Sequence, residues 1–144
     1  MPGLVMAGVG HGPLRGVDLA LGAGEVGWVQ GPTASGKTLL LYLAAGLVLP
    51  EAGRVTVDGA APAPPAVGMA FQSPDYQLVA PRADADVALN ARSEAAVEEA
   101  LDAAGCREFR DLAPEDLTPG QRRRVALAGV LAAGPSLALL DTPF

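Results

Sequence analysis

The eight residues from Gly31 to Thr38 constrain this chain more than any other stretch. They fit the phosphate-loop pattern G-x-x-x-x-G-K-[ST] at every fixed position. The stretch reads Gly31-Pro32-Thr33-Ala34-Ser35-Gly36-Lys37-Thr38. Glycines let backbone N–H groups turn towards phosphate oxygens, the lysine reaches the outer phosphates, and the last hydroxyl suits Mg²⁺. The pattern therefore predicts a site for a nucleoside triphosphate such as ATP.

The flanking residues support this interpretation. Residues 25–30 are mostly apolar and predict a strand with Trp28 in the core, and residues 39–45 predict a helix. The alternative is an ordinary glycine-rich turn whose glycines serve only tight packing. Lys37 is the only lysine among ten basic residues. The chain uses arginine at every other basic position. A lysine here favours phosphate binding, because a compact ammonium on a flexible stem is the better phosphate ligand at this position.

Composition narrows the class of protein. Half of the 144 residues are hydrophobic, which suits one globular domain. The formal net charge of −6 opposes a general nucleic-acid-binding role. Cys106 is the single cysteine and is expected to be a packing residue. The longest apolar run, 39–49, is shorter than the roughly 20 residues that span a bilayer, and no secretion signal is evident. We expect a cytoplasmic protein.

The remaining elements follow from hydrophobic periodicity and turn residues. Helices are predicted after a Ser93 cap and at about 120–133, and the proline-rich stretch 60–65 is predicted to be a loop. Strands are predicted at 4–9, 17–21, 54–59, 67–72 and 137–141. His11, the only histidine, falls in a predicted turn. It is interpreted either as an exposed loop residue or as a stacking partner for an adenine ring.

Two of the predicted strands end in polar side chains. One runs from Val67 to Gln72, and the other from Leu137 to Asp141. In open α/β sheets, ligands bind at the carboxyl ends of the strands. Gln72 and Asp141 are therefore candidate site residues.

The order of these motifs resembles the nucleotide-binding subunit of ABC transporters. The resemblance implies an α/β P-loop NTPase fold of the ABC ATPase type, three-layered, with a small helical subdomain. One ATP-binding domain would cover 1–144, with its core sheet in 1–72 and 134–144 and its helices in 73–133. The resemblance assigns catalytic roles to Lys37, Gln72 and Asp141. It assigns the Mg²⁺ ligands to Thr38, Gln72 and Asp141.

A further segment, Leu117-Thr118-Pro119-Gly120-Gln121, resembles the family signature L-S-G-G-Q. The threonine keeps a hydroxyl, whereas the proline removes one backbone N–H that would face a phosphate. The resemblance implies that Thr118, Gly120 and Gln121 bind the nucleotide of a second subunit in a head-to-tail dimer. We expect this half of the composite site to bind more weakly than in the family.

The stretch from Phe71 to Pro81 narrows the resemblance. Its Pro74-Asp75-Tyr76-Gln77 is similar to the ATPases of energy-coupling-factor importers, which take up vitamins and cobalt or nickel ions. This implies a homo- or heterodimer coupled to a membrane-embedded transporter subunit. The chain would then lie on the inner face of the cell membrane through that partner, and no nucleic-acid partner is expected.

Two departures from the family bear on turnover. Thr142 stands where the family has a glutamate that polarises the attacking water, and a hydroxyl is a much poorer base. The sequence also ends at Phe144, before the family's switch histidine. We therefore expect weak or no hydrolysis by the isolated chain, as a C-terminally truncated fragment or as a degenerate subunit. The alternatives are a non-hydrolysing dimerisation module and a soluble ABC-type ATPase not linked to transport.

Overall fold

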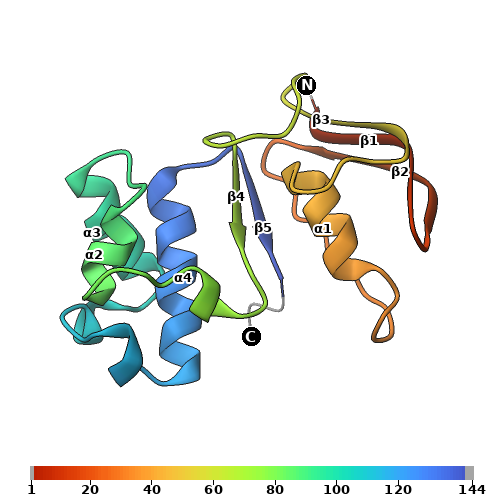
Figure 1. Ribbon diagram of the computed structural model, residues 1–144. Coiled ribbons are helices and arrows are strands. Elements are labelled where there is room, and N and C mark those ends of the chain that lie inside the picture. Colours follow the sequence, from red (N-terminus) through yellow and green to blue (C-terminus); the bar gives the residue numbers. More distant parts are fainter. Residues whose placement is uncertain (1, 142–144) are drawn as a thin grey trace. The chain divides into compact units, whose positions relative to one another are not determined.

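The computed structural model describes residues 2–141 (Figure 1). Thr142, and with it the predicted departure at the catalytic base, lies outside the described residues. The chain divides into two compact units, residues 1–67 and 68–144, and each is described by itself. The predicted division into a core sheet and a helical subdomain follows a different boundary and stays a prediction.

The first unit is built on a three-stranded antiparallel sheet with the strand order β2-β1-β3. The strands are β1 (Pro2–His11), β2 (Leu14–Gly22) and β3 (Ala52–Val57). Alternation along β1 buries Leu4 and Met6, and the next buried residue is Val9. The step of three coincides with a register shift between Met6 and Val9 and with a positive φ of 59° at Gly8. The strands predicted at 4–9 and 17–21 are confirmed, and the strand predicted at 54–59 is present as β3 but begins and ends two residues earlier, because residues 58–59 form a turn.

Helix α1 (Lys37–Ala45) begins within the phosphate-loop stretch, at its last two residues, and confirms the predicted helix. It begins after Gly36 and ends before Gly46, both of which adopt left-handed backbone conformations. Leu43 and Ala44 are buried. His11 is the last residue of β1, and its Nδ1 lies 3.0 Å from the carbonyl oxygen of Leu49. The predicted turn around His11 is therefore shorter than expected.

The predicted strand at 25–30 is wrong. In the described part of the chain these residues form no strand, and the side chains of Val26 and Trp28 are 91% and 67% exposed. Trp28 is therefore not a core residue in this structure. An apolar run without alternation is typical of a strand flanked on both edges and covered on both faces. The antiparallel sheet of the first unit pairs β1 with β2 and β3 and includes no residue of 25–30.

The second sheet pairs β4 (Val67–Ala70) with β5 (Leu137–Leu140), and both strands run in the same direction (Figure 1). The pairing extends one residue past β5, because the N–H of Asp141 donates to the carbonyl of Ala70, the last residue of β4, over 2.9 Å. A Cβ on Gly68 would lie 2.9 Å from the side chain of Val130, so glycine allows close packing there. The two predicted strands are confirmed, with slightly earlier ends.

Three helices pack together in the second unit, α2 (Ala83–Ala88), α3 (Glu94–Ala103) and α4 (Pro119–Ala133). Three short 3₁₀ turns accompany them: η1 (Pro74–Tyr76) precedes α2, and η2 (Arg107–Phe109) and η3 (Pro114–Asp116) lie between α3 and α4. Their buried residues form one cluster that contains Val87, Leu101, Cys106, Phe109, Leu117 and Val125. Ser93 caps α3, since its Oγ accepts a hydrogen bond from the N–H of Ala96. The two predicted helices are confirmed, and α2 was not predicted.

Cys106 is fully buried in this cluster. Burial raises the pKa of its thiol to about 11, which keeps it protonated at neutral pH. The predicted packing role is therefore consistent with its environment. No helix in residues 2–141 is both long and apolar enough to cross a membrane.

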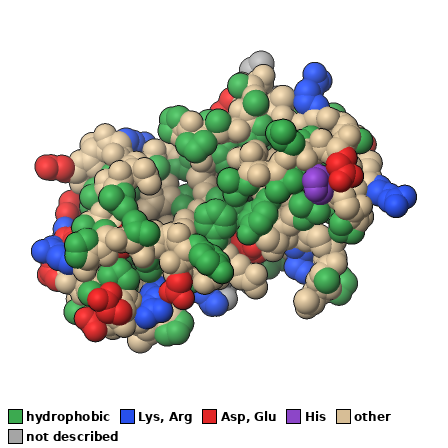
Figure 2. Space-filling model, in the orientation of Figure 1, with side chains coloured by type: hydrophobic (Ala, Val, Ile, Leu, Met, Phe, Trp, Pro, Cys, Tyr) green, Lys and Arg blue, Asp and Glu red, His purple; other side chains and the backbone are tan. Residues whose placement is uncertain are grey.

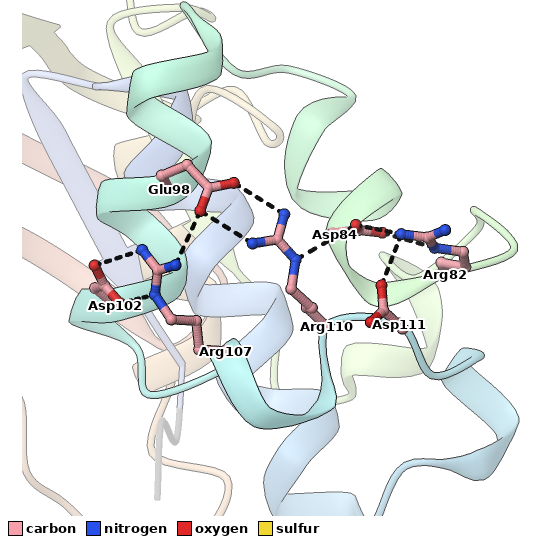
Figure 3. A network of polar contacts seen from close by, with 7 residues as sticks. All are labelled: Arg82, Asp84, Glu98, Asp102, Arg107, Arg110 and Asp111. Carbon is pink, nitrogen blue, oxygen red and sulfur yellow. Dashed lines mark hydrogen bonds and ion pairs between the residues drawn. The ribbon is translucent and has the colours of Figure 1, made fainter.

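A chain of alternating charges links α2, α3 and η2 on the surface of the second unit (Figure 3). Both carboxylate oxygens of Glu98 accept hydrogen bonds from Arg110, at 2.9 and 3.0 Å, and these bonds hold the pKa of Glu98 below its usual range. The other members are Arg82, Asp84, Asp102, Arg107 and Asp111. Exposed ion pairs contribute little stability one by one, so this network chiefly orients the elements that it joins.

Candidate nucleotide-binding site

The phosphate loop closes tightly on itself. The N–H of Ser35 donates to the carbonyl of Pro32 over 3.2 Å, and Ala34 and Gly36 both have positive φ values, 64° and 98°. A Cβ on Gly31 would lie 2.7 Å from the Oγ of Ser35, so a larger residue at the start of the loop would force the Ser35 side chain to move. Left-handed backbone at a residue other than glycine is uncommon and concentrates at functional sites. The local geometry agrees with a loop shaped to surround a ligand.

Lys37 lies across this loop. Its Nζ donates to the carbonyl oxygens of Gly31 and Pro32, both at 2.7 Å, and approaches the Oγ of Ser35 at 3.4 Å. All three of these acceptors are uncharged, so none of them offsets the positive charge of the ammonium in the loop. Thr38 follows as the second residue of α1 and is half-buried. The loop thus combines a fixed cation with the N-terminal end of a helix, the arrangement that favours binding of phosphate groups.

Gln72 and Asp141 follow adjacent strands. The hydrogen bond from Asp141 N–H to Ala70 places Asp141 beside the end of β4, two residues before Gln72. The structure therefore brings the two predicted strand-end residues to the same end of this sheet. Gln72 is exposed and lies in the stretch that leads from β4 to η1.

Gln77 fixes the backbone just before Gln72, a role that the sequence did not indicate. Its Nε2 donates to the carbonyl of Met69 over 2.8 Å, and its Oε1 accepts from the N–H of Phe71 over 2.9 Å. The side-chain amide therefore bonds β4 as a neighbouring strand would. Residues two apart in a strand present their polar groups to the same edge. Gln77 thus occupies one edge of β4 while Asp141 bonds Ala70 at its end.

The segment that resembles the family signature forms the start of α4. Thr118 Oγ1 accepts from the N–H of Gln121 over 3.2 Å, and Gln121 Oε1 accepts from the N–H of Thr118 over 2.9 Å. This reciprocal pair is a capping box. Pro119 occupies the first helical position, where its missing N–H leaves no helical hydrogen bond unmade. The proline is therefore compatible with the helix, and Gly120 has open space where a Cβ would point.

The candidate residues are divided between the two units. The phosphate loop with Lys37 and Thr38 belongs to the first, and the second contains Gln72, Asp141 and the start of α4. The joint arrangement of the two sets remains a prediction. The donor types fit Mg²⁺, since hydroxyl, amide and carboxylate oxygens are hard ligands. Within residues 2–141, no group of three or more His, Cys, Asp or Glu side chains forms a metal site by itself.

Asp86 supports the segment that follows Gln72 and was missed in the sequence. It is buried, with 8% of its surface exposed, and its Oδ1 accepts from the N–H groups of Val79 and Ala80 at 2.8 and 2.9 Å. Its Oδ2 is buried and has no hydrogen-bond partner among the described residues. The sequence gives no signal of this burial, because Asp86 is an acidic residue in a short alanine-rich stretch. The two N–H groups that it accepts from belong to the loop before α2.

We expect Asp86→Ala to destabilise the fold by about 2 kcal/mol, because it leaves the partly buried N–H groups of Val79 and Ala80 without their acceptor. Asp86→Asn is the matched control, since it keeps Oδ1 as an acceptor and should cost about 1 kcal/mol or less. Urea denaturation followed by circular dichroism measures both values. Equal losses for the two variants would contradict the role assigned to Oδ1.

The sequence matches known proteins over most of its length. The family model described as ABC transporter matches residues 14–144. The energy-coupling factor transporter ATP-binding protein EcfA1 of Symbiobacterium thermophilum is 42% identical and aligns with 90% of this chain and 51% of its own length. The energy-coupling factor transporter ATP-binding protein EcfA of Methanocaldococcus jannaschii is 33% identical, with 93% and 54% covered. The chain spans about half the length of these curated relatives.

Solved structures agree with the sequence matches. A structure of cbiO1 from Clostridium perfringens, described as part of the ABC transporter complex cbiONQ, superimposes with a TM-score of 0.82 at 27% identity over 97% of this chain and 65% of that one. The ATP-binding cassette MJ0796, in a dimeric post-hydrolysis state bound to ADP and Pi, gives 0.81 at 26% identity, with 97% and 74% covered. The predicted α/β fold of the ABC ATPase type is confirmed.

Proposed function

This chain belongs to the ABC transporter family, and we propose that it is the ATP-binding subunit of an energy-coupling-factor-like importer. Binding and hydrolysis of MgATP would be coupled to uptake of a small solute. The observation that carries the proposal is the closed phosphate loop with Lys37 Nζ held at 2.7 Å from two of its carbonyl oxygens. The names of the relatives, which are ATP-binding proteins of energy-coupling factor transporters, support the same function.

The phosphate loop and the two strand ends have different roles in this proposal. Lys37 neutralises the outer phosphates, and the loop N–H groups bind their oxygens. Thr38, Gln72 and Asp141 would hold Mg²⁺ through oxygen atoms. When bound, the ion supplies positive charge that neutralises the phosphates in phosphoryl transfer. Gln72 also orients the attacking water, because its amide both donates and accepts hydrogen bonds.

The start of α4 would serve the nucleotide of a second subunit. The lone pair of Thr118 Oγ1 accepts from Gln121 N–H, so its own proton stays available for a phosphate oxygen. Head-to-tail dimerisation would then enclose MgATP between one subunit's phosphate loop and the partner's Thr118, Gly120 and Gln121. The similar ATP-binding cassette MJ0796 is dimeric in a structure bound to ADP and Pi, which supports dimerisation.

Hydrolysis is the step on which the first alternative differs. A non-hydrolysing module would use ATP only to dimerise, and Thr142 favours this reading because its hydroxyl is a poor base. The two readings differ in one measurement, the steady-state release of phosphate by purified protein at saturating MgATP. Retention of unhydrolysed ATP in the dimer would favour the binding-only module.

The partner proposed for this chain is a membrane-embedded transporter subunit, which would keep it on the inner face of the cell membrane. Two large apolar side chains shortly after Gln72, Tyr76 and Val79, are 83% and 75% exposed. Exposed apolar residues gathered beside a functional loop are typical of a protein contact. The alternative, a soluble ATPase acting on nucleic acid, would need a basic face. On the face drawn in Figure 2, basic and acidic side chains are interspersed.

We expect Tyr76→Ser combined with Val79→Ser to lower recovery of the chain with its transporter subunit by at least about tenfold, because two apolar contacts are lost. The measurement is co-purification from detergent-solubilised membranes of cells that express both subunits, with the transporter subunit identified by mass spectrometry. Leu49→Ser, at an exposed leucine of the first unit, is the control and should leave recovery unchanged. Unchanged recovery of the double variant would contradict a contact at this surface.

A further inference from the structure

We propose that Arg122 is a positioning residue that ties the turn after Gln72 to the signature-like segment. Arg122 directly follows Gln121 in the first turn of α4. Its Nε donates to the carbonyl of Pro114 over 2.9 Å, Nη1 donates to Asp75 Oδ1 over 3.0 Å, and Nη2 approaches the carbonyl of Glu115 at 3.4 Å. One side chain therefore joins η1, η3 and α4.

Arginine suits this position because its donors form a rigid planar fork. An exposed ion pair such as Arg122 with Asp75 is weak when it stands alone. Here two backbone carbonyls already hold the guanidinium, so Asp75 meets a partner that is fixed in place. Asp75, Leu78, Pro114, Glu115 and Arg122 line a cavity of about 210 Å³. The connection between the two turns therefore depends on the arginine side chain more than on close packing around it.

The C-terminal end of η1 is hydrogen-bonded to the end of β4. Gln77, the residue after η1, bonds Met69 and Phe71 through its side-chain amide. Gln72 thus lies in a short segment held to β4 by Gln77 and to α4 by Asp75 and Arg122. A displacement of Gln72 is passed to the start of α4, where Thr118 lies. This consequence rests on the proposed function, which gives Gln72 and Thr118 their roles at the nucleotide.

The direct test is amide hydrogen exchange of the full chain, measured by NMR without nucleotide. The probes are the N–H of Gln77, which bonds Pro74, and the N–H of Leu117, which bonds Pro114. Arg122→Ala should speed exchange at both by roughly three- to tenfold, because both turns lose the same anchor. Asp75→Ala should speed exchange at Gln77, and should add nothing in the Arg122→Ala background.

The control is Arg123→Ala, the neighbouring arginine in α4, whose side chain makes no hydrogen bond or ion pair with the residues that the structure describes. It should leave both rates at their wild-type values. The proposal is overturned if Arg122→Ala changes the Gln77 rate no more than Arg123→Ala does. It is also overturned if Asp75→Ala keeps its full effect when Arg122 is absent.

A second arm adds saturating MgATP. In the wild type, nucleotide should alter exchange at both probes, whereas in Arg122→Ala it should alter exchange at Gln77 alone. If MgATP changes the exchange rate of the Leu117 N–H equally in the wild type and in Arg122→Ala, the proposed coupling through Arg122 is overturned. Calorimetry on the wild type separates the two levels of inference. If MgATP does not bind, the proposed function fails, and the arm without nucleotide still decides whether Arg122 ties the two turns.

Discussion

Lys37→Ala should lower the affinity for ATP by at least about a hundredfold while leaving the fold intact. Lys37 contributes the one positively charged side chain of the phosphate loop, and hydrogen bonds from a cation to phosphate oxygens are among the strongest in proteins. Its present acceptors, the carbonyls of Gly31 and Pro32, are exposed and can bond to water after the substitution. Fluorescence titration with a labelled ATP analogue measures the change.

The control for this prediction is Arg54→Ala, which removes an exposed cation from β3 in the same unit. It should leave the affinity within about twofold, because a distant surface charge is screened by salt. Circular dichroism should give the same thermal midpoint for Lys37→Ala and wild type to within a few degrees. Equal ATP affinities for Lys37→Ala and Arg54→Ala would contradict the role of Lys37 in nucleotide binding.

Asp141→Asn should reduce the effect of magnesium on nucleotide affinity by about tenfold or more. A carboxylate is a far better ligand than an amide for a hard divalent cation, whereas the two groups have nearly the same shape. ATP affinity without magnesium should therefore change little. Parallel titrations with and without Mg²⁺ give the ratio for each protein.

Asp116→Asn is the matched control for Asp141→Asn, since Asp116 is an exposed carboxylate of η3. Its magnesium ratio should equal that of the wild type. If Asp141→Asn shows the wild-type ratio too, Asp141 is not part of the metal shell, and Gln72 and Thr38 would be left as the candidates.

Much of the fold was predictable because local signals and tertiary contacts agree. The alternation in 54–59 and the Ser93 cap depend on neighbours within a few residues, and the structure contains both β3 and α3. The strand ends at Gln72 and Asp141 were also predictable, since apolar runs that end in one polar side chain are typical of parallel strands at a site. The family resemblance added the order of these motifs, and the sequence matches confirm it.

The features that were missed depend on contacts that the local pattern does not specify. Residues 25–30 have the composition of a buried strand, but a strand needs neighbours to complete its hydrogen bonds. Arg122 bonds Asp75 across 47 residues, Gln77 bonds the backbone at the end of β4, and Asp86 bonds the N–H groups of a loop. Nothing in the local pattern distinguishes these three side chains from ordinary surface polar residues. Only the tertiary structure shows that their hydrogen bonds hold the segment around Gln72 in place.

Isothermal titration of the wild-type chain with ATP in the presence of Mg²⁺ tests the central claim most directly. The account predicts saturable binding of one ATP per chain, with an affinity that falls when magnesium is chelated and is lost in Lys37→Ala. Absence of saturable binding up to millimolar ATP, in protein shown by circular dichroism to be folded, would contradict it.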